Sequence, residues 1–271
     1  MNALVISVLL FNTITAQSSS PWKLSWSDEF NGNTLNTSKW NTKSNFTHCY
    51  PPDPCEEHQL YIKDGINLKN GRLQITTQKQ TVIGPNGIQK KFTSGWIDSK
   101  SKFSQKQGRW EANCSLPSRN ASGIWPAFWL LPSTLCWPTG SEIDIFEYGG
   151  NTIEDDIFGS YHWGTKCGKD KFPIPGKGYQ PVHSAIDWQR NFHVYAVEWT
   201  ATKLDYYVDN VLYFSRGTKD GYVMPTEEMY IILNQAVGGI LSAPTGDYDG
   251  GVVLIVEYVR VYESVPSMLV T

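Results

Sequence analysis

The amino-acid sequence predicts an all-β fold, a jelly-roll β-sandwich of two curved antiparallel sheets with a concave cleft. Short runs rich in β-branched and aromatic residues recur along the chain, and turns rich in Gly and Pro separate them. No twelve-residue stretch combines helical periodicity with capping residues. Many short strands of this kind are typical of a sandwich or a barrel, and a jelly roll fits best because its concave face can hold a chain-like ligand.

Eight runs are expected to form strands. The last of them is almost continuously β-branched and aromatic, which favours a strand. Two neighbouring runs flank Asp209 and Asn210, which tolerate a positive φ, so these runs are predicted to form a tight hairpin. In chain order the expected strands are residues 72–77, 109–116, 142–147, 192–199, 203–208, 211–214, 229–233 and 252–262.

Length and composition limit the class of protein. The 271 residues suffice for one large domain or two small ones, and 40% hydrophobic against 18% charged residues allow a sizeable core and exclude disorder. The formal net charge is −3 with both signs interspersed, which excludes an electrostatic footprint for nucleic acid. No linker, charge block or repeat divides residues 17–271, so a single domain is expected there.

The N-terminus has the pattern of an export signal. Residues 3–11 are apolar, polar residues follow, and Ala16 ends a plausible cleavage site, so residues 1–16 are expected to be a signal peptide of a secreted, extracellular protein. The charged segment that usually opens such a signal is missing apart from the terminal amine, and a disordered or buried tail is the alternative. The apolar run is too short to span a membrane, and no later stretch is long enough.

Five cysteines leave at least one thiol unpaired within a monomer. Cys49 and Cys55 bracket a proline-rich loop and are expected to form a local disulfide, and Cys136 and Cys167, in loops on either side of an acidic run, are expected to form a second. Cys114 lies within an expected strand and is the candidate free thiol. Metal binding by these cysteines is less favoured, because no C-x-x-C pair occurs. Sequons for N-glycans occur at Asn36, Asn45, Asn113 and Asn120.

The most informative run, residues 142–147, reads Glu-Ile-Asp-Ile-Phe-Glu. Alternate residues of a strand lie on opposite faces, so Glu142 and Asp144 are expected together, opposite to the isoleucines. Glu147 lies five positions after Glu142, and in a regular strand an odd separation would place it on the opposite face. One extra residue would restore the parity, and we therefore predict a β-bulge around Ile145-Phe146 that turns all three acids to the cleft.

Carboxylates placed this closely repel one another, and the fold gains no stability from them. Glycoside hydrolysis is a reaction that needs paired carboxylates, one ionised and one protonated at the same pH. Four strand steps separate the outer α-carbons by roughly 13 Å. The side chains must therefore lean together for a retaining mechanism, and an inverting separation stays open. An acidic strand edge and a Ca²⁺ site are the alternatives.

A tryptophan-rich segment leads into these acids. Residues 123–132 read GIWPAFWLLP, residues 137–147 read WPTGSEIDIFE, and His162 follows. This combination resembles glycoside hydrolase family 16, and within it the laminarinase branch, which cleaves β-1,3-glucans. Further matching segments, which extend the resemblance over nearly the whole chain after the N-terminal run, are residues 26–32, 94–100, 108–112 and 233–239.

The resemblance implies a jelly roll and a retaining, double-displacement mechanism. Glu142 would be the nucleophile, Glu147 the acid/base, and Asp144 an assistant that hydrogen-bonds and adjusts the charge of its neighbours. At least one of the acids should have a raised pKa, because three like charges cannot all ionise cheaply. The expected activity is endo-acting hydrolysis of laminarin-type β-glucan by a monomer that needs no cofactor.

Further residues are candidates for substrate binding. Indole faces pack well against the C–H face of a pyranose, and amides can hydrogen-bond to sugar hydroxyls. The histidine matches the family's histidine after the acids, where it would bind substrate or orient a carboxylate; a structural role is the alternative for it, as a core position is for one or two of the tryptophans. The candidates are Trp125, Trp129, Trp137, His162, Asn234 and Gln235.

Two positions depart from the pattern that the resemblance implies. Many relatives have E-A-R where this chain has Glu111-Ala112-Asn113, so a substrate-facing arginine is expected to be missing. If Asn113 faces the cleft, its sequon is not expected to carry a glycan in an active form. Several relatives bind a structural Ca²⁺ on the convex face, and Glu257 is the candidate position here, in place of an Asp.

Other functions remain open at this stage. A glucan-recognition module without catalysis is disfavoured because such proteins lack one or both glutamates. The transferases of the family carry the shorter spacing E-x-D-x-E, which disfavours a transglycosylase. A hydrolase of mixed-linkage β-1,3-1,4-glucan, agar or carrageenan stays an alternative, because loops set that choice.

Overall fold

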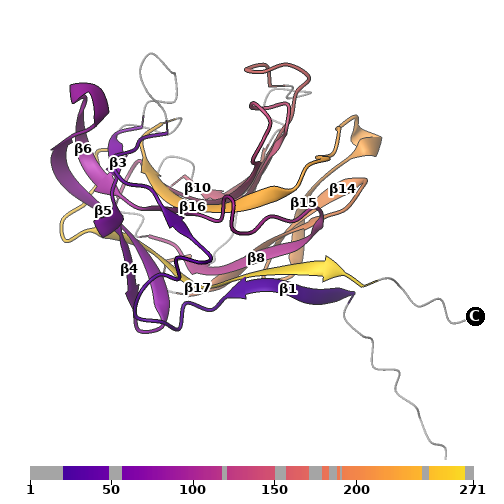
Figure 1. The fold of residues 1–271 in the computed structure, drawn as a ribbon, viewed down its shortest axis with the longest axis horizontal. Coiled ribbons are helices and arrows are strands. Elements are labelled where there is room, and N and C mark those ends of the chain that lie inside the picture. The colour runs from indigo at the N-terminus through magenta and orange to yellow at the C-terminus, as the bar shows by residue number, and fades with distance from the viewer. Residues whose placement is uncertain are drawn as a thin grey trace, which may run out of the picture.

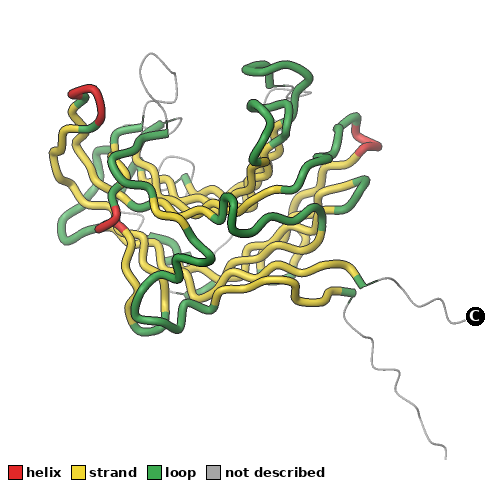
Figure 2. The backbone as a smooth tube through the Cα atoms, viewed as in Figure 1, coloured by secondary structure: helices red, strands yellow, loops and turns green. Residues whose placement is uncertain are grey.

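The computed structural model describes residues 21–48, 57–117, 121–149, 157–170, 179–182, 188–189, 191–239 and 244–265. Within these ranges the chain is built of strands joined by loops, with three single-turn 3₁₀ helices and no α-helix (Figure 2). The 3₁₀ helices are η1 (Lys63–Gly65), η2 (Pro85–Gly87) and η4 (Thr218–Asp220). No helix in the described part of the chain is long and apolar enough to cross a membrane.

Two stacked sheets make up the fold, as Figure 1 shows. The larger sheet has ten strands in the order β15-β14-β13-β8-β17-β5-β6-β3, with β1 beside β17 and β4 beside β5. The smaller sheet has seven, in the order β12-β11-β10-β9-β16-β7-β2. The strands are β1 (Trp22–Asp28), β2 (Asn41–Thr42), β3 (Gln59–Tyr61), β4 (Ile66–Lys69), β5 (Arg72–Ile83), β6 (Gln89–Ser94), β7 (Trp96–Asp98), β8 (Gly108–Ser115), β9 (Ile124–Pro132), β10 (Glu142–Tyr148), β11 (Ile157–His162), β12 (Tyr179–Val182), β13 (His193–Trp199), β14 (Lys203–Val208), β15 (Val211–Gly217), β16 (Met229–Val237) and β17 (Val252–Ser264).

The predicted jelly-roll sandwich is confirmed. All eight expected strands are present, as β5, β8, β10 and β13 to β17, and the pairings within both sheets are antiparallel except for the parallel pair β3 and β6. Asp209 and Asn210 form the predicted tight hairpin, with φ values of 49° and 64°. This turn geometry matches the right-handed twist of the two strands that it joins.

The hydrophobic core lies between the two sheets. Alternate residues of β8, such as Trp110 and Ala112, point into it and are fully buried, as are Phe128 of β9 and Leu233 of β16. Burial of each large apolar side chain contributes roughly 1.5–3 kcal/mol to stability. The opposite faces of the same strands are therefore left for polar and aromatic groups, and the candidate site lies on such a face of the smaller sheet.

The cysteine predictions are confirmed as far as the described residues reach. Cys136 and Cys167 form a disulfide with a Cα–Cα distance of 5.6 Å. Cys114 is a free, buried thiol, and its burial raises its pKa well above the ordinary value. The expected Cys49–Cys55 bridge, the signal peptide of residues 1–16 and the sequon at Asn120 lie outside the described residues.

Candidate active site

A β-bulge in β10 brings the three acids to one face. The register of β10 shifts between Asp144 and Glu147 against β11, and between Asp144 and Phe146 against β9. Ile145 and Phe146 both lie in the core, with 1% and 0% of their surface exposed. Two successive inward residues reverse the parity of the strand, and the predicted bulge is confirmed.

Glu147 is held by hydrogen bonds at both of its oxygens. The indole nitrogen of Trp125 in β9 donates to Oε1 at 2.8 Å, and the hydroxyl of Ser160 in β11 donates to Oε2 at 3.2 Å. Glu147 as a whole residue is 8% exposed. Its carboxyl is therefore oriented by side chains from both neighbouring strands and is largely shielded from water.

Glu142 and Asp144 lie beside His162, which is the strand partner of Glu142 in β11. The Nε2 atom of His162 is 3.4 Å from Oδ2 of Asp144, and ligand atoms of Glu142, Asp144 and His162 lie within 4.8 Å of one another. On its other side His162 contacts Asp170 through Nδ1, at 2.6 Å from Oδ2. The imidazole is thus clamped between two carboxylates, which fixes the orientation of its ring.

The pKa values of this group are raised by burial. Burial and then the charge of Asp144 raise the pKa of Glu147 to about 8, against opposing effects of His162, Trp125 and Ser160. The same two causes raise the pKa of Glu142 well above its ordinary value. Burial alone would lower the pKa of His162, but its contacts with the carboxylates of Asp144 and Asp170 outweigh burial and raise the pKa well above the ordinary value. At neutral pH the site thus combines a cationic imidazole with a carboxylic acid.

The three candidate tryptophans occupy different positions. Trp125 is half-buried against Glu147, and Gly239 makes room for its ring: a Cβ at Gly239, whose φ is +67°, would lie 2.2 Å from the indole. Trp137 is 44% exposed, and its ring centroid lies 5.9 Å from that of His162. Trp129 is nearly buried, with its indole nitrogen bonded to Asn234 at 2.7 Å. Trp125 and Trp137 are therefore the more accessible rings beside the acids.

Asn234 and Gln235 point in opposite directions. Asn234 faces the acids' side of the sheet, where its amide donates to the hydroxyl of Tyr61 at 2.9 Å. Gln235 is completely buried between the sheets, and its amide donates to Thr77 Oγ1 at 2.8 Å and to the carbonyl of Val252 at 2.9 Å. The prediction that Gln235 binds sugar hydroxyls is wrong, because successive residues of a regular strand face opposite ways.

Several residues of the site carry no signal that points to them in the sequence alone. Asp170 lies in a loop after β11, and only the folded chain places it on His162. Ser160 could have been found, because it lies two positions before His162 and therefore on the same face of the strand. A second aromatic cluster lies beside Asn234 on this face and includes Tyr61, Trp96, Trp129 and Tyr230, with Phe46 packed against it.

Asn113 lies on the other sheet. It faces outward from β8, where its amide donates to Glu257 Oε2 at 2.7 Å. The expectation that this position faces the substrate is therefore wrong. The side chain at position 113 lies on the outer face of the larger sheet, so an arginine in its place would not point toward the acids. Its sequon is half-buried at the surface of the larger sheet, whereas Asn36 and Asn45 are exposed.

Glu257 does not fit a calcium site as it is arranged here. Both of its carboxylate oxygens accept hydrogen bonds, Oε1 from Arg72 at 2.9 Å and Oε2 from Asn113. A guanidinium in contact with the carboxylate repels a cation, and Ca²⁺ requires six to eight oxygen ligands. The three residues of the described chain whose ligand atoms do lie close together, within 4.8 Å, are Glu142, Asp144 and His162.

Comparisons with known proteins agree with this geometry. A family model described as glycosyl hydrolases family 16 matches residues 56–251. The chain is 28% identical to the glucan endo-1,3-beta-glucosidase A1 of Niallia circulans over 89% of its own length, although it spans only 38% of that protein. It is 30% identical to a beta-glucanase of Rhodothermus marinus, over 89% of this chain and 85% of that protein.

A solved structure gives the same result. The X-ray structure of the endo-beta-1,3-glucanase from Pyrococcus furiosus superimposes with a TM-score of 0.78 at 29% identity and covers 90% of this chain and 95% of that one. The resemblance that the acidic run and the tryptophan segment indicate is thereby confirmed, and the chain belongs to glycosyl hydrolase family 16.

Proposed function

We propose that this chain is an endo-acting β-glucan hydrolase that cleaves internal β-1,3-glucosidic bonds of laminarin-type glucans with retention of configuration. The observation that carries the proposal is the bulge that turns Glu142, Asp144 and Glu147 to one face. The names of the relatives, a glucan endo-1,3-beta-glucosidase and an endo-beta-1,3-glucanase, support the substrate.

In the first step the carboxylate of Glu142 attacks the anomeric carbon. The bond from this carbon to the glycosidic oxygen breaks, and the carboxyl proton of Glu147 passes to that oxygen as the leaving chain departs. A pKa of about 8 keeps Glu147 protonated at neutral pH, as this role requires. Glu142 must lose its proton to act as the nucleophile, although burial and the charge of Asp144 raise its pKa. The imidazolium of His162, opposite Glu142 in the strand pair, opposes these two effects and favours the ionised form.

In the second step the carboxylate of Glu147 takes a proton from water. The resulting hydroxide attacks the anomeric carbon, the ester bond to Glu142 breaks, and both carboxyl groups return to their first state. Asp144 supports this sequence by the negative charge that raises the pKa of Glu147. Trp125 and Trp137 offer indole faces for the sugars on either side of the bond.

Product analysis tests the substrate. Incubation with laminarin, lichenan and agarose should yield short oligosaccharides from laminarin, with internal cleavage visible as a rapid fall in mean chain length and a β-anomer as the first product by proton NMR. If laminarin is inert and lichenan or agarose is degraded, the β-1,3 assignment is wrong while the roles of the acids stand.

The alkaline limb of the pH profile tests the role of Glu147. Because burial and Asp144 raise the pKa of this acid to about 8, kcat/KM should fall as the pH rises through about 8. Replacement Trp125→Phe removes a hydrogen bond that stabilises the carboxylate, so the limb should move to higher pH. Trp129→Phe is the matched control. It also removes an indole hydrogen bond, but that bond goes to Asn234, so the limb should stay in place. If Trp125→Phe does not shift the alkaline limb of kcat/KM, the assignment of that limb to Glu147 is contradicted.

Export is part of the same proposal. The apolar run at residues 3–11 and the cleavage site at Ala16 support a secreted protein. The disulfide between Cys136 and Cys167 also supports an oxidising compartment, because such bonds persist there and are rare in the cytosol.

A further inference from the structure

The outer face of the larger sheet carries a hollow on the side of the sandwich away from the acids. Its volume is about 430 Å³, within the range of roughly 300–1,000 Å³ that small-molecule sites occupy. Aromatic side chains from three strands wall it: Trp22 of β1, Tyr207 of β14 and Tyr262 of β17. The floor is formed by Arg109 and Glu111 of β8 and by Glu198 of β13.

The charges on this floor are unusually buried for the outer face of a sheet. Arg109 is 8% exposed and Glu111 is 7% exposed. The guanidinium donates to Glu111 at 2.9 Å, to Glu198 at 3.0 Å and to the side chain of Asn210 at 2.9 Å. Removing such groups from water costs several kcal/mol per ion, and apolar residues of the same size would join the strands at lower cost. Strand association alone therefore does not explain this arrangement.

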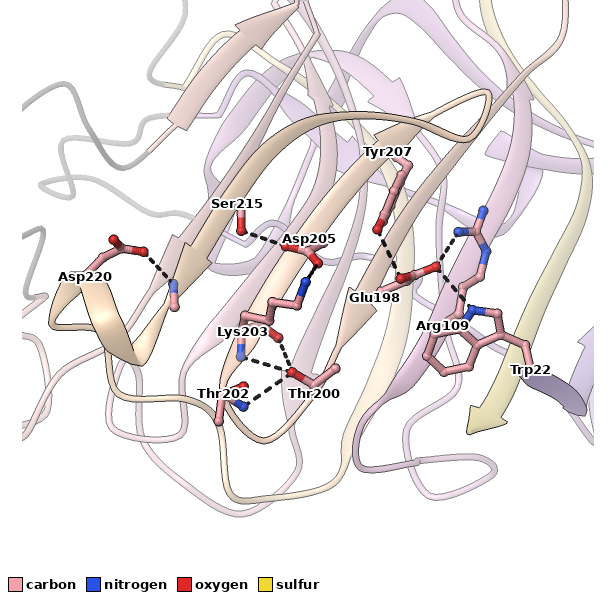
Figure 3. A network of polar contacts seen from close by, with 11 residues as sticks. Trp22, Arg109, Glu198, Thr200, Thr202, Lys203, Asp205, Tyr207, Ser215 and Asp220 are labelled. Carbon is pink, nitrogen blue, oxygen red and sulfur yellow. Dashed lines mark hydrogen bonds and ion pairs between the residues drawn. The ribbon is translucent and has the colours of Figure 1, made fainter. Parts of the chain in front are cut away.

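The aromatic walls hold the floor in one arrangement. The indole nitrogen of Trp22 and the hydroxyl of Tyr207 donate to Glu198 at 3.2 and 3.1 Å, and Figure 3 shows both rings converging on this carboxylate together with Arg109. The hydroxyl of Tyr262 donates to Glu111 at 3.0 Å. A ligand that enters the hollow would therefore meet side chains that are already ordered, which reduces the entropic cost of binding.

The chemistry of the hollow selects a neutral, hydroxyl-rich ligand. The floor contains one guanidinium and two carboxylates, so its formal charge is −1. This negative charge disfavours phosphate, sulfate and carboxylate ligands. Carboxylate oxygens and tyrosine hydroxyls accept further hydrogen bonds, and the exposed amide of Asn210 can donate them. The half-buried rings offer apolar faces. A pyranose combines these properties, since it has hydroxyls at its edge and C–H groups on its faces.

We propose that this hollow is a second, non-catalytic binding site for a neutral β-glucan segment. The proposal rests on the proposed function for the identity of the sugar. A site on the far face cannot bind the bond being cleaved, so its effect is to hold the protein on a polymeric or particulate glucan. Each bound segment raises the local concentration of substrate at the acids.

Stoichiometry of binding tests the proposal. The full chain with Glu147→Gln, which leaves the sugar intact, is titrated calorimetrically with laminarihexaose, and two sites per chain are expected. The same chain with Trp22→Ala and Tyr207→Ala should retain one site, and its affinity for the other should fall about tenfold or more, the equivalent of roughly 1.4 kcal/mol. Equal binding by both chains, or binding of spermine in place of the sugar, overturns the proposal.

Kinetics supply the second measurement. In the otherwise unaltered chain, Trp22→Ala/Tyr207→Ala should raise KM for particulate β-1,3-glucan by about fivefold and leave kcat/KM for laminaritetraose unchanged. Phe192→Ala is the matched control. Phe192 packs against the guanidinium of Arg72, as Tyr207 packs against that of Arg109, but it lies outside the hollow. An unchanged KM on the particulate substrate overturns the proposal.

A second variant guards against loss of folding. Asn210→Gly removes the amide at the rim and keeps the positive φ that the hairpin requires. It should weaken the second site. Because it also removes the acceptor of one Arg109 hydrogen bond, a small loss of stability is expected, but unfolding by urea should stay a single cooperative transition. Full affinity in this chain overturns the assigned role of the amide. If the proposed function itself fails, the wild-type chain hydrolyses no glucan, and a single site that Trp22→Ala/Tyr207→Ala abolishes still supports the hollow.

Discussion

Replacement of either Glu142 or Glu147 by alanine should abolish glucan hydrolysis and leave the fold intact. Loss of a positioned general acid alone typically costs about 10²–10⁴-fold in rate, and loss of the nucleophile removes the covalent route altogether, so a fall in kcat/KM of about 10⁴-fold or more is expected for Glu142→Ala. The fold should survive, because each replacement relieves repulsion within a buried acidic group. Laminarin hydrolysis and urea unfolding are the measurements.

Azide distinguishes the two roles. With an aryl β-laminaribioside whose leaving group needs no protonation, azide can attack the anomeric carbon directly in the Glu142→Ala chain, and a single displacement gives an α-glycosyl azide. In the Glu147→Ala chain Glu142 still forms the ester, azide then displaces it, and two inversions give a β-glycosyl azide. The reverse outcome would exchange the two roles. Glu263→Ala, which alters only an exposed ion pair with Lys23, is the control and should keep full activity.

Replacement Gln235→Ala should lower the free energy of unfolding by about 2–4 kcal/mol, because it removes buried hydrogen bonds, strands their acceptors and leaves a cavity. The amide joins β16 of the smaller sheet to Thr77 of β5 and to Val252 of β17 in the larger one. Its side chain has no surface at the acids, so kcat and KM at 25 °C should stay within a factor of about two. Unfolding in urea followed by tryptophan fluorescence measures the loss.

Asn234→Ala is the matched comparison for this prediction. This replacement removes an amide that is one methylene shorter, one position earlier in β16. Asn234 lies on the face that carries the acids, where it bonds to Trp129 and Tyr61. This change should raise KM for laminarin. If Gln235→Ala raises KM and leaves stability unchanged, the burial of Gln235 between the sheets is contradicted.

The alternation of apolar and polar residues in the sequence was enough to predict many of the strands and part of the active site. The alternation of Glu142, Ile143 and Asp144, together with the misplaced Glu147, was sufficient to predict the bulge. The same rule applied to β16 would have separated Asn234 from Gln235, since adjacent strand residues cannot share a face. Strand β9 gives a weaker strand signal, because Pro126 and Pro132 lack amide hydrogens and proline usually marks an edge strand.

Contacts between distant segments could not be predicted in this way. Asp170 reaches His162 through a loop whose path depends on the whole fold, and it shares no face or period with its partner. The family motif before Asn113 suggested that an arginine in its place would face the substrate. The motif lies on the larger sheet, and Asn113 is on the outer face of that sheet, which points away from the acids. The local sequence predicts that a segment forms a strand and which of its residues share a face. It does not predict which of the two sheets the strand joins.

The sequence by itself determined that the chain is all-β, that three carboxyl groups share a face through a bulge, and that tryptophans approach them. These properties are local, because they follow from the two-residue period of a strand and from the chemistry of neighbouring side chains. Only the tertiary structure decided that Gln235 joins the two sheets and that Arg72 binds the carboxylate of Glu257. It also decided that aromatic and charged residues of five strands meet in the hollow on the outer face of the larger sheet. Such sites join residues far apart in the chain, and their geometry exists only once the sheets have paired and packed.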